Sequence, residues 1–177
     1  MKKIYIIATN TGTYFSKVLR FVTREKYVHV SIALDEKFNK VYSFGRKKIN
    51  WILPAGFVEE DLNKITAIFK DSISQVYELN ITNKQYYNLK KIIKKDFIRE
   101  SFKYKYNIRG LPMIQFNKVY QRKYHYVCSQ FCGKLLSDAD IYDFKKDYSL
   151  IKPKDIFNMK GLKLIYEGKT IDFINKL

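Results

Sequence analysis

The stretch "YVHVSIALD", residues 27–35, alternates between large apolar side chains and polar or small ones. The apolar set is Val28, Val30, Ile32 and Leu34, and the opposite set is His29, Ser31 and Ala33. A period of two residues predicts a β-strand with one face on the core and the other turned away from it. His29 therefore lies on the face opposite the apolar set.

A second alternating segment, "NKVYSFGRK", follows at residues 39–47, and "DEKFN" between the two suits a hairpin connection. If residues 35–39 close the hairpin tightly, Leu34 pairs with Phe38. Counting outward, His29 then lies opposite Ser43. Directly opposed residues project to the same face about 4.5–5.5 Å apart at Cβ, so we expect Ser43 to orient the imidazole.

Further elements are predicted on both sides of this hairpin. Before it we expect a buried strand over 2–8 and an amphipathic helix within 10–26, with Phe15, Val18, Leu19 and Val22 at helical spacing. After it we expect a surface excursion over 50–62, a strand over 74–81 and a helix over 82–101 that begins with a capping box of Thr82 and Gln85. The remaining elements are a loop over 102–116, a helix from near 128, and a last hairpin turned at Glu167-Gly168. No repeat or linker interrupts the chain, so we expect one α+β domain over residues 1–177, mainly an antiparallel sheet packed with helices.

The composition is that of a folded protein with an unusual charge. Hydrophobic residues make up 46% and aromatic residues 16%, and 34 Lys and Arg against 17 Asp and Glu give a formal charge of +17. Such a charge favours anionic partners, namely nucleic acid, acidic lipid surfaces or acidic substrates. The alternative is compositional drift, because the chain is also rich in Ile, Asn, Tyr and Phe.

The two cysteines do not form a disulfide framework, and free thiols favour a reducing compartment. The apolar run near the N-terminus is about five residues, shorter than the roughly 7–15 of a signal peptide core. No 18-residue apolar span is present. We therefore expect a soluble, cytoplasmic protein.

Both cysteines lie in "YHYVCSQFCGKLL", residues 124–136, where an extended segment runs into a helical stripe. Cys128 falls at the predicted helix start, where unpaired N–H groups and the helix dipole stabilise a thiolate, the reactive form of cysteine. The alternative is structural: Cys128 shares a helix face with Phe131, Cys132 and Leu135 and can simply extend the apolar stripe.

Taken together, "HVSIAL" on an early strand, a polar residue on the next strand and a late "CSQF" opening a helix resemble the circularly permuted papain-like hydrolases. These form the permuted, YiiX-like branch of the NlpC-type superfamily. In ordinary papain-like chains the cysteine precedes the histidine, whereas here His29 precedes Cys128, as in the permuted branch. The layout of strand, Thr/Gly-rich turn, helix and histidine strand in residues 6–35 also matches, and "YSFGRK", "GFVEE" and "YVCSQF" add to the resemblance. It covers roughly residues 2–60 and 124–170.

The resemblance implies a cysteine hydrolase or acyltransferase that acts on an amide, peptide or ester bond through an acyl-enzyme, without a cofactor. Cys128 matches the nucleophile and His29 the general base. The third position falls on Ser43, a departure from the usual Glu, Asp, Gln or His, and Glu59 is an alternative. The backbone N–H of Cys128 would contribute to an oxyanion hole. Residues expected to line the substrate pocket are Thr9, Asn10, Thr11 and Gln130.

Two other arrangements of these residues compete with this assignment. Cys128, Cys132, His125 and His29 give a zinc-like count of ligands, but the spacing contains no C-x2-C or H-x3-H pair, so we expect no metal. His125 is a second possible base. Its odd spacing from Cys128 on an extended segment turns it to the opposite face.

A basic stripe runs along the predicted helix over 82–101. It consists of Lys90, Lys91, Lys94, Lys95 and Arg99, with tyrosines nearby. It is a candidate contact surface for nucleic acid or an anionic membrane; the plainer alternative is the solvated side of an amphipathic helix. The competing function is thus a non-catalytic basic binding module whose Cys–His pair is structural.

Overall fold

The computed structural model describes residues 1–13, 16–17, 20, 25–48 and 54–177. Six antiparallel strands form one sheet in the order β4-β3-β2-β1-β5-β8. They are β1 (Lys2–Asn10), β2 (His29–Ala33), β3 (Val41–Arg46), β4 (Ala55–Glu60), β5 (Ile73–Ile81) and β8 (Lys163–Lys169). A short parallel pair is made by β6 (Lys105–Tyr106) and β7 (His125–Tyr126). The α+β class and the mainly antiparallel sheet agree with the prediction.

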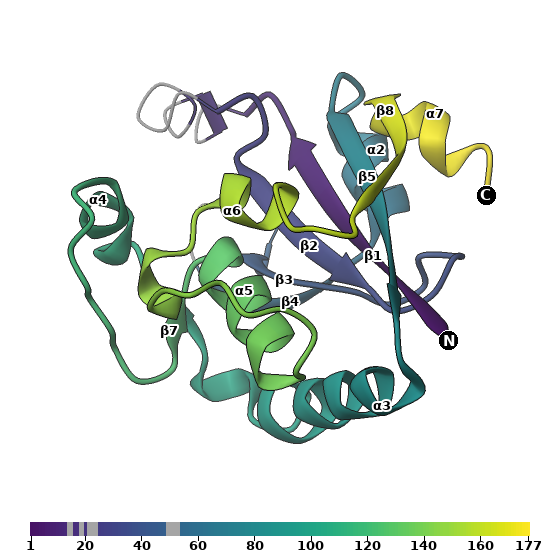
Figure 1. Ribbon diagram of the computed structural model, residues 1–177. Coiled ribbons are helices and arrows are strands. Elements are labelled where there is room, and N and C mark those ends of the chain that lie inside the picture. Colours follow the sequence, from purple (N-terminus) through teal and green to yellow (C-terminus); the bar gives the residue numbers. More distant parts are fainter. Residues whose placement is uncertain (14–15, 18–19, 21–24, 49–53) are drawn as a thin grey trace.

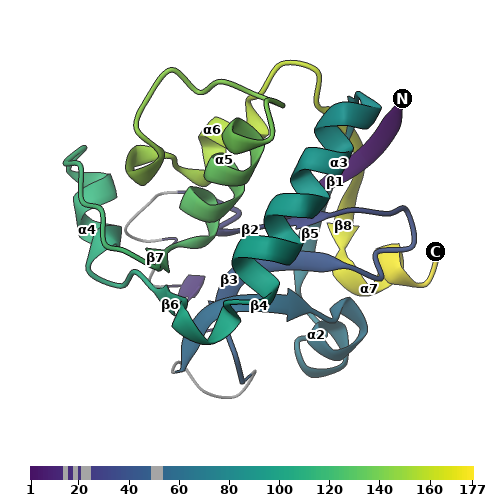
Figure 2. The same ribbon diagram turned by 90° about the horizontal axis from the view of Figure 1, so that it is seen from below.

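Helices cover both faces of the sheet (Figure 1). The α-helices are α2 (Leu62–Ile68), α3 (Asn83–Ile92), α4 (Gly110–Gln115), α5 (Cys128–Asp138), α6 (Pro153–Phe157) and α7 (Thr170–Ile174). Shorter helical turns are the π-helix Ile93–Ile98, which continues α3, and the 3-10 turns Ser101–Lys103 and Tyr148–Leu150. Figures 1 and 2 show α3 and α5 together on one face, with α2 and α7 on the other. No helix among the described residues is long and apolar enough to span a membrane.

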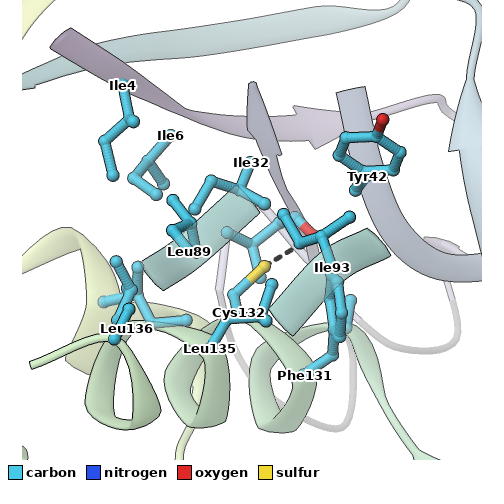
Figure 3. Packing of buried hydrophobic residues seen from close by; sticks show 14 of the residues in the cluster. Ile4, Ile6, Ile32, Tyr42, Leu89, Ile93, Phe131, Cys132, Leu135 and Leu136 are labelled. Carbon is cyan, nitrogen blue, oxygen red and sulfur yellow. Dashed lines mark hydrogen bonds between the residues drawn. The ribbon is translucent and has the colours of Figure 1, made fainter. Parts of the chain in front are cut away.

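The larger core lies between the sheet and the α3–α5 pair (Figure 3). The strands contribute Ile4, Ile6, Ile32 and Tyr42, and the helices contribute Leu89, Ile93, Phe131, Cys132, Leu135 and Leu136. Burying each large side chain contributes about 1.5–3 kcal/mol, which holds α5 firmly against β2. The predicted apolar stripe of α5 is confirmed, and so is the capping box of α3, in which Thr82 and Gln85 each accept the other's backbone N–H at 3.2 and 2.9 Å.

The register of the β2–β3 hairpin differs from the prediction by two residues. Ala33 pairs with Val41, and the Leu34 N–H donates to the Lys40 carbonyl at 3.3 Å. A smaller core consists of Tyr5, Ile7, Ala33, Phe38, Val41, Leu62, Val76 and Phe173. The connection is longer than expected because Phe38 adopts a left-handed conformation (φ 54°) that buries its ring in this smaller core. When the same antiparallel pairing is continued along both strands, Ser31 and not His29 falls opposite Ser43. A shift of two residues keeps each side chain on its face.

The predicted surface excursion over 50–62 is wrong where the structure describes it. Ala55–Glu60 is an edge strand that pairs along the whole of β3, and Asp61 then caps α2 by accepting the Lys64 N–H at 3.1 Å. Gly56 looked like a chain breaker. Its actual role is close packing, because a Cβ there would collide with the backbone carbonyl of Tyr104.

The structure also bears on the predictions for the C-terminal hairpin, the 102–116 loop and the helix within 10–26. The C-terminal hairpin is wrong: β8 pairs with β5, and α7 replaces the expected return strand because Phe173 packs against Phe38 at 4.9 Å between ring centroids. The loop over 102–116 contains β6 and α4. The apolar positions of the helix within 10–26, Phe15, Val18, Leu19 and Val22, lie outside the described residues.

Candidate active site

Cys128 is the first residue of α5, and its side chain is buried at 4% exposure. Val127 before it is extended (φ −96°, ψ 169°), so the chain turns from strand to helix at the cysteine. The sulfur lies 3.9 Å from the Val28 carbonyl oxygen, on the residue preceding His29. The early strand and the late helix therefore converge, 100 residues apart in the chain, and place the thiol at the N-terminal end of the helix dipole.

His29, the first residue of β2, is held by a carboxylate on the edge strand. Its Nε2 lies 2.6 Å from Oε1 of Glu60, whose side chain is only 9% exposed. Ser43 Oγ lies 3.2 Å from the same nitrogen and donates its own hydrogen to the Val30 carbonyl at 2.9 Å. With Nε2–H directed at Glu60, the ring nitrogen left for Cys128 is Nδ1.

The prediction for the third catalytic position, the residue that orients His29, is thus partly wrong. Ser43 does contact the imidazole, although from a diagonal position, and the charged partner is Glu60 rather than Glu59. Glu59 is exposed and lies opposite Tyr42 on the face of the larger core. Strand alternation settles the choice, because Phe57 points into that core and Glu59 shares its face. The sequence could distinguish Glu60 from Glu59 only if residues 55–60 were first predicted to form a strand.

The surroundings raise the pKa of His29 from 6.5 to about 10. Burial acts most strongly and alone would lower the pKa. It is outweighed by the charge of Glu60, by a hydrogen bond with Cys128, and by the hydrogen bond with Glu60. His29 is therefore held as an imidazolium by the carboxylate of Glu60.

Tyr106 is a neighbour of Cys128 that sequence reasoning missed. Burial, together with the nearby Cys128 side chain, raises the pKa of Tyr106 well above its ordinary value. The parallel β6–β7 pair sets Tyr106 opposite Tyr126, two residues before the cysteine. Nothing in "FKYKYNI" distinguishes this tyrosine from Tyr104.

A cavity of about 310 Å³ adjoins these residues. His29, Glu60 and Tyr106 belong to its wall, and Cys128, which raises the pKa of both His29 and Tyr106, lies behind that wall and is not part of the lining. The volume lies at the lower end of the ~300–1,000 Å³ typical of small-molecule sites. The site can therefore receive a small ligand next to the sulfur.

The residues expected to line a substrate pocket divide into two pairs. Thr9 and Thr11 do line the cavity. Asn10 does not. Its amide donates to the Lys26 carbonyl at 3.0 Å, and its Oδ1 accepts the Gly12 N–H at 3.0 Å, so it shapes the turn. Gln130 is wrong as a substrate contact, because its amide is buried between the Val127 N–H at 3.0 Å and the Ser149 carbonyl at 2.9 Å.

Cys132 and His125 lie apart from this chemistry. Cys132 is fully buried, its sulfur lies 3.7 Å from the Val30 carbonyl, and burial raises the pKa of its thiol well above the usual value. Figure 3 shows this sulfur among the apolar side chains of the core. The Nδ1 of His125 hydrogen-bonds the Lys123 carbonyl at 2.8 Å. Within the described part of the chain, no group of three or more His, Cys, Asp or Glu is arranged to hold a metal ion.

The basic stripe of Lys90, Lys91, Lys94, Lys95 and Arg99 is exposed along α3 and the π-helix that continues it. Lys90 lies over the Tyr86 ring at 5.5 Å. Among the described residues, none of the five basic side chains forms an ion pair. This surface presents positive charge without internal neutralisation, on the larger-core side of the sheet.

Comparisons with protein-family models, with curated proteins and with solved structures give no significant match to this chain.

Proposed function

We propose that the protein is a cysteine hydrolase or acyltransferase with a permuted papain-like fold, acting on an amide, peptide or ester bond. One observation carries the proposal: His29, which Glu60 holds at 2.6 Å, has its pKa raised by Cys128 as well as by Glu60, and the Cys128 sulfur at the start of α5 lies 3.9 Å from the carbonyl of the residue before His29. A nucleophile, a base and a carboxylate that orients the base are the parts that nucleophilic catalysis requires. They come from three separate elements, α5, β2 and β4.

The raised pKa of His29 suggests how the reaction would proceed. His29 is an imidazolium that Glu60 stabilises, and the reacting form of Cys128 beside it is the thiolate. The thiolate attacks the carbonyl carbon, and the oxygen becomes an oxyanion near the Cys128 N–H and the Tyr106 hydroxyl. The C–N or C–O bond then breaks as His29 gives its proton to the leaving group, and an acyl thioester remains on Cys128.

Deacylation restores the pair. Neutral His29 takes a proton from water, the resulting hydroxide attacks the thioester, and the thiolate leaves as the carboxylic acid is released. An amine or alcohol that replaces water would make the same step an acyl transfer. Two free cysteines favour a reducing compartment, so we place this reaction in the cytoplasm.

The arrangement of elements supports the permuted papain-like assignment. The histidine begins a central strand of an antiparallel sheet, and the cysteine begins a helix packed on that strand. The histidine precedes the cysteine in the chain, as in the permuted branch.

Competition between the two thiols tests the proposal. The protein is treated with iodoacetamide at pH 6–7, and alkylation at each cysteine is followed by peptide mass spectrometry. Cys128 should react at least about tenfold faster than the buried Cys132, because a thiolate is the reactive form. His29→Ala should abolish this preference, whereas the matched variant His125→Ala should keep it. Equal, slow labelling of both cysteines in the wild-type protein would contradict the proposal.

The basic surface supports a second candidate function, a module that binds nucleic acid or an anionic membrane. Its test is binding of a labelled oligonucleotide and of phosphatidylserine vesicles at several salt concentrations, with wild type and a Lys90→Glu, Lys94→Glu double variant. Binding that falls steeply with salt, is lost in the double variant and survives Cys128→Ala would support it. Binding unaffected by the double variant would exclude this surface.

A further inference from the structure

Arg46, the last residue of β3, lines the same cavity as His29 and Glu60. Its guanidinium carbon lies 5.2 Å from the centre of the Phe69 ring, which also lines the cavity. Gly45, its neighbour in the strand, approaches the imidazole so closely that a Cβ there would lie 3.6 Å from His29 Cε1. Arg46 is therefore one residue from a direct contact with the candidate catalytic histidine.

The acidic side chains that line the cavity are engaged elsewhere. Glu60 holds His29 at 2.6 Å, and Asp61 holds Lys64 at 3.4 Å while capping α2. Glu59 lies opposite Tyr42, whose pKa is raised by burial and then by the charge of Glu59. No acidic partner of Arg46 is found among the described residues, whose ion pairs involve other cations.

Arg46 is a partly buried cation without an acidic partner among the described residues. The side chain is partly buried, and burial lowers the pKa of the guanidinium below its ordinary value. A cation removed from water and not paired loses solvation free energy without a compensating interaction. A bound oxyanion would restore it, since the planar guanidinium donates two parallel hydrogen bonds to a carboxylate or phosphate.

The remaining wall decides which anion fits best. Phe44, Val58, Ile65 and Ile108 are apolar, which suits a hydrocarbon portion of a ligand. The wall carries three acidic residues, Glu59, Glu60 and Asp61, and three basic ones, Arg46, Lys47 and Lys64, besides the protonated His29. The single excess positive charge suits a singly charged carboxylate better than a phosphate dianion. Lys64 is paired with Asp61 and Lys47 is exposed, so Arg46 is the partly buried cation that remains for an oxyanion beside the apolar surface.

We propose that Arg46 binds a carboxylate in this cavity, and that the substrate class is amides or esters carrying a carboxylate and an apolar group. The first part concerns binding alone. The second rests on the proposed reaction at Cys128. Arg46 would act as a specificity-determining residue, with the apolar part of the substrate on Val58 and Ile108.

The binding test uses three probes of equal chain length: hexanoate, the neutral hexanamide, and hexyl phosphate. Each is titrated into ¹⁵N-labelled protein while the amide signals of Gly45, Arg46 and Ile108 are followed. Hexanoate should bind about tenfold or more tightly than hexanamide, the range of a charge-assisted hydrogen bond, and more tightly than hexyl phosphate. Equal affinities of hexanoate and hexanamide would overturn the proposal, and tighter binding of hexyl phosphate would replace carboxylate by phosphate.

Substitutions of Arg46 test whether this residue causes the preference for hexanoate over hexanamide. Arg46→Gln should remove the advantage of hexanoate over hexanamide, whereas the exposed control Arg99→Gln should retain it. Circular dichroism verifies that both variants fold. A preference that survives Arg46→Gln would show that another group binds the anion. Arg46→Lys should keep part of the affinity, because the charge remains and the fork geometry is lost.

Two further arms separate this inference from the proposed reaction. Hexanoate binding should be unchanged in Cys128→Ala, so the binding result does not depend on a reactive thiol. In the wild-type protein, saturating hexanoate should slow alkylation of Cys128 and saturating hexanamide should not. Binding without protection would overturn the substrate class, whereas an unreactive Cys128 with intact binding would overturn only the proposed reaction.

Discussion

The contact between Glu60 and His29 allows a quantitative test of the site without knowledge of the substrate. Glu60→Gln keeps the size of the side chain and an oxygen near His29 Nε2, but removes the negative charge. The matched control is Glu59→Gln on the same strand, because Glu59 is exposed, pairs opposite Tyr42 and does not bond His29. A difference between the two variants therefore reports the buried charge.

The size of the effect follows from the pKa of His29. Raising it from 6.5 to about 10 corresponds to about 5 kcal/mol of differential interaction, at about 1.36 kcal/mol per pKa unit. Burial opposes this shift, and Cys128 contributes to it along with Glu60. We assign about 2 kcal/mol to the charge of Glu60, the range of a charge-assisted hydrogen bond. For a chain of this length, this is a fall of about 4–8 °C in Tm.

The effect depends on pH with a definite sign. The folded protein binds the His29 proton more tightly than the unfolded chain does, so the stabilisation is complete below about pH 6.5 and disappears as the pH rises through about 10. Urea unfolding followed by circular dichroism should therefore show a loss of about 2 kcal/mol for Glu60→Gln at pH 6, and less than about 0.5 kcal/mol at pH 10.5. Glu59→Gln should cost less than about 0.5 kcal/mol at both pH values. An equal loss for Glu60→Gln at both pH values would refute the charged pair.

Three further substitutions test neighbouring features. Tyr106→Phe removes the hydroxyl whose pKa the nearby Cys128 raises, so alkylation of Cys128 at pH 7 should become slower; an unchanged rate would show that the hydroxyl does not act on the sulfur. Gly133→Ala should destabilise the protein by about 1–3 kcal/mol in urea unfolding, because the new Cβ would collide with the side chain of Ile151; a gain in stability, as at an unhindered helix position, would contradict that packing. Thr82→Ala removes the capping box of α3 and should cost about 1 kcal/mol, seen as a fall of about 2–4 °C in Tm, and an unchanged Tm would show that the cap does not matter.

Local patterns were sufficient for elements whose own residues determine them. The alternation in 27–35 predicts β2, and the capping box with its apolar stripe predicts α3, because periodicity and capping depend on short-range spacing. The convergence of β2 and α5 was inferred from the resemblance rather than from periodicity. Contacts between segments 100 residues apart leave no local trace in the sequence.

The parts that escaped prediction depend on tertiary packing. The hairpin register depends on Phe38, whose ring finds a place in the smaller core only when the connection is lengthened. Glu60 was hidden because Gly56 resembles a chain breaker, whereas the Tyr104 carbonyl requires a residue without Cβ there. Tyr106 lies on a two-residue strand, too short to produce any pattern.

The two sulfurs of α5 lie beside β2 at matching intervals. Cys128 and Cys132 face the carbonyls of Val28 and Val30, so four residues of helix, about 6 Å, run alongside two residues of strand, about 6.6 Å. Because these two lengths are nearly equal, any sliding of the helix along the strand would disturb both sulfur–carbonyl contacts together. The position of the Cys128 thiol along β2 is therefore tied to that of Cys132, one turn further into the core.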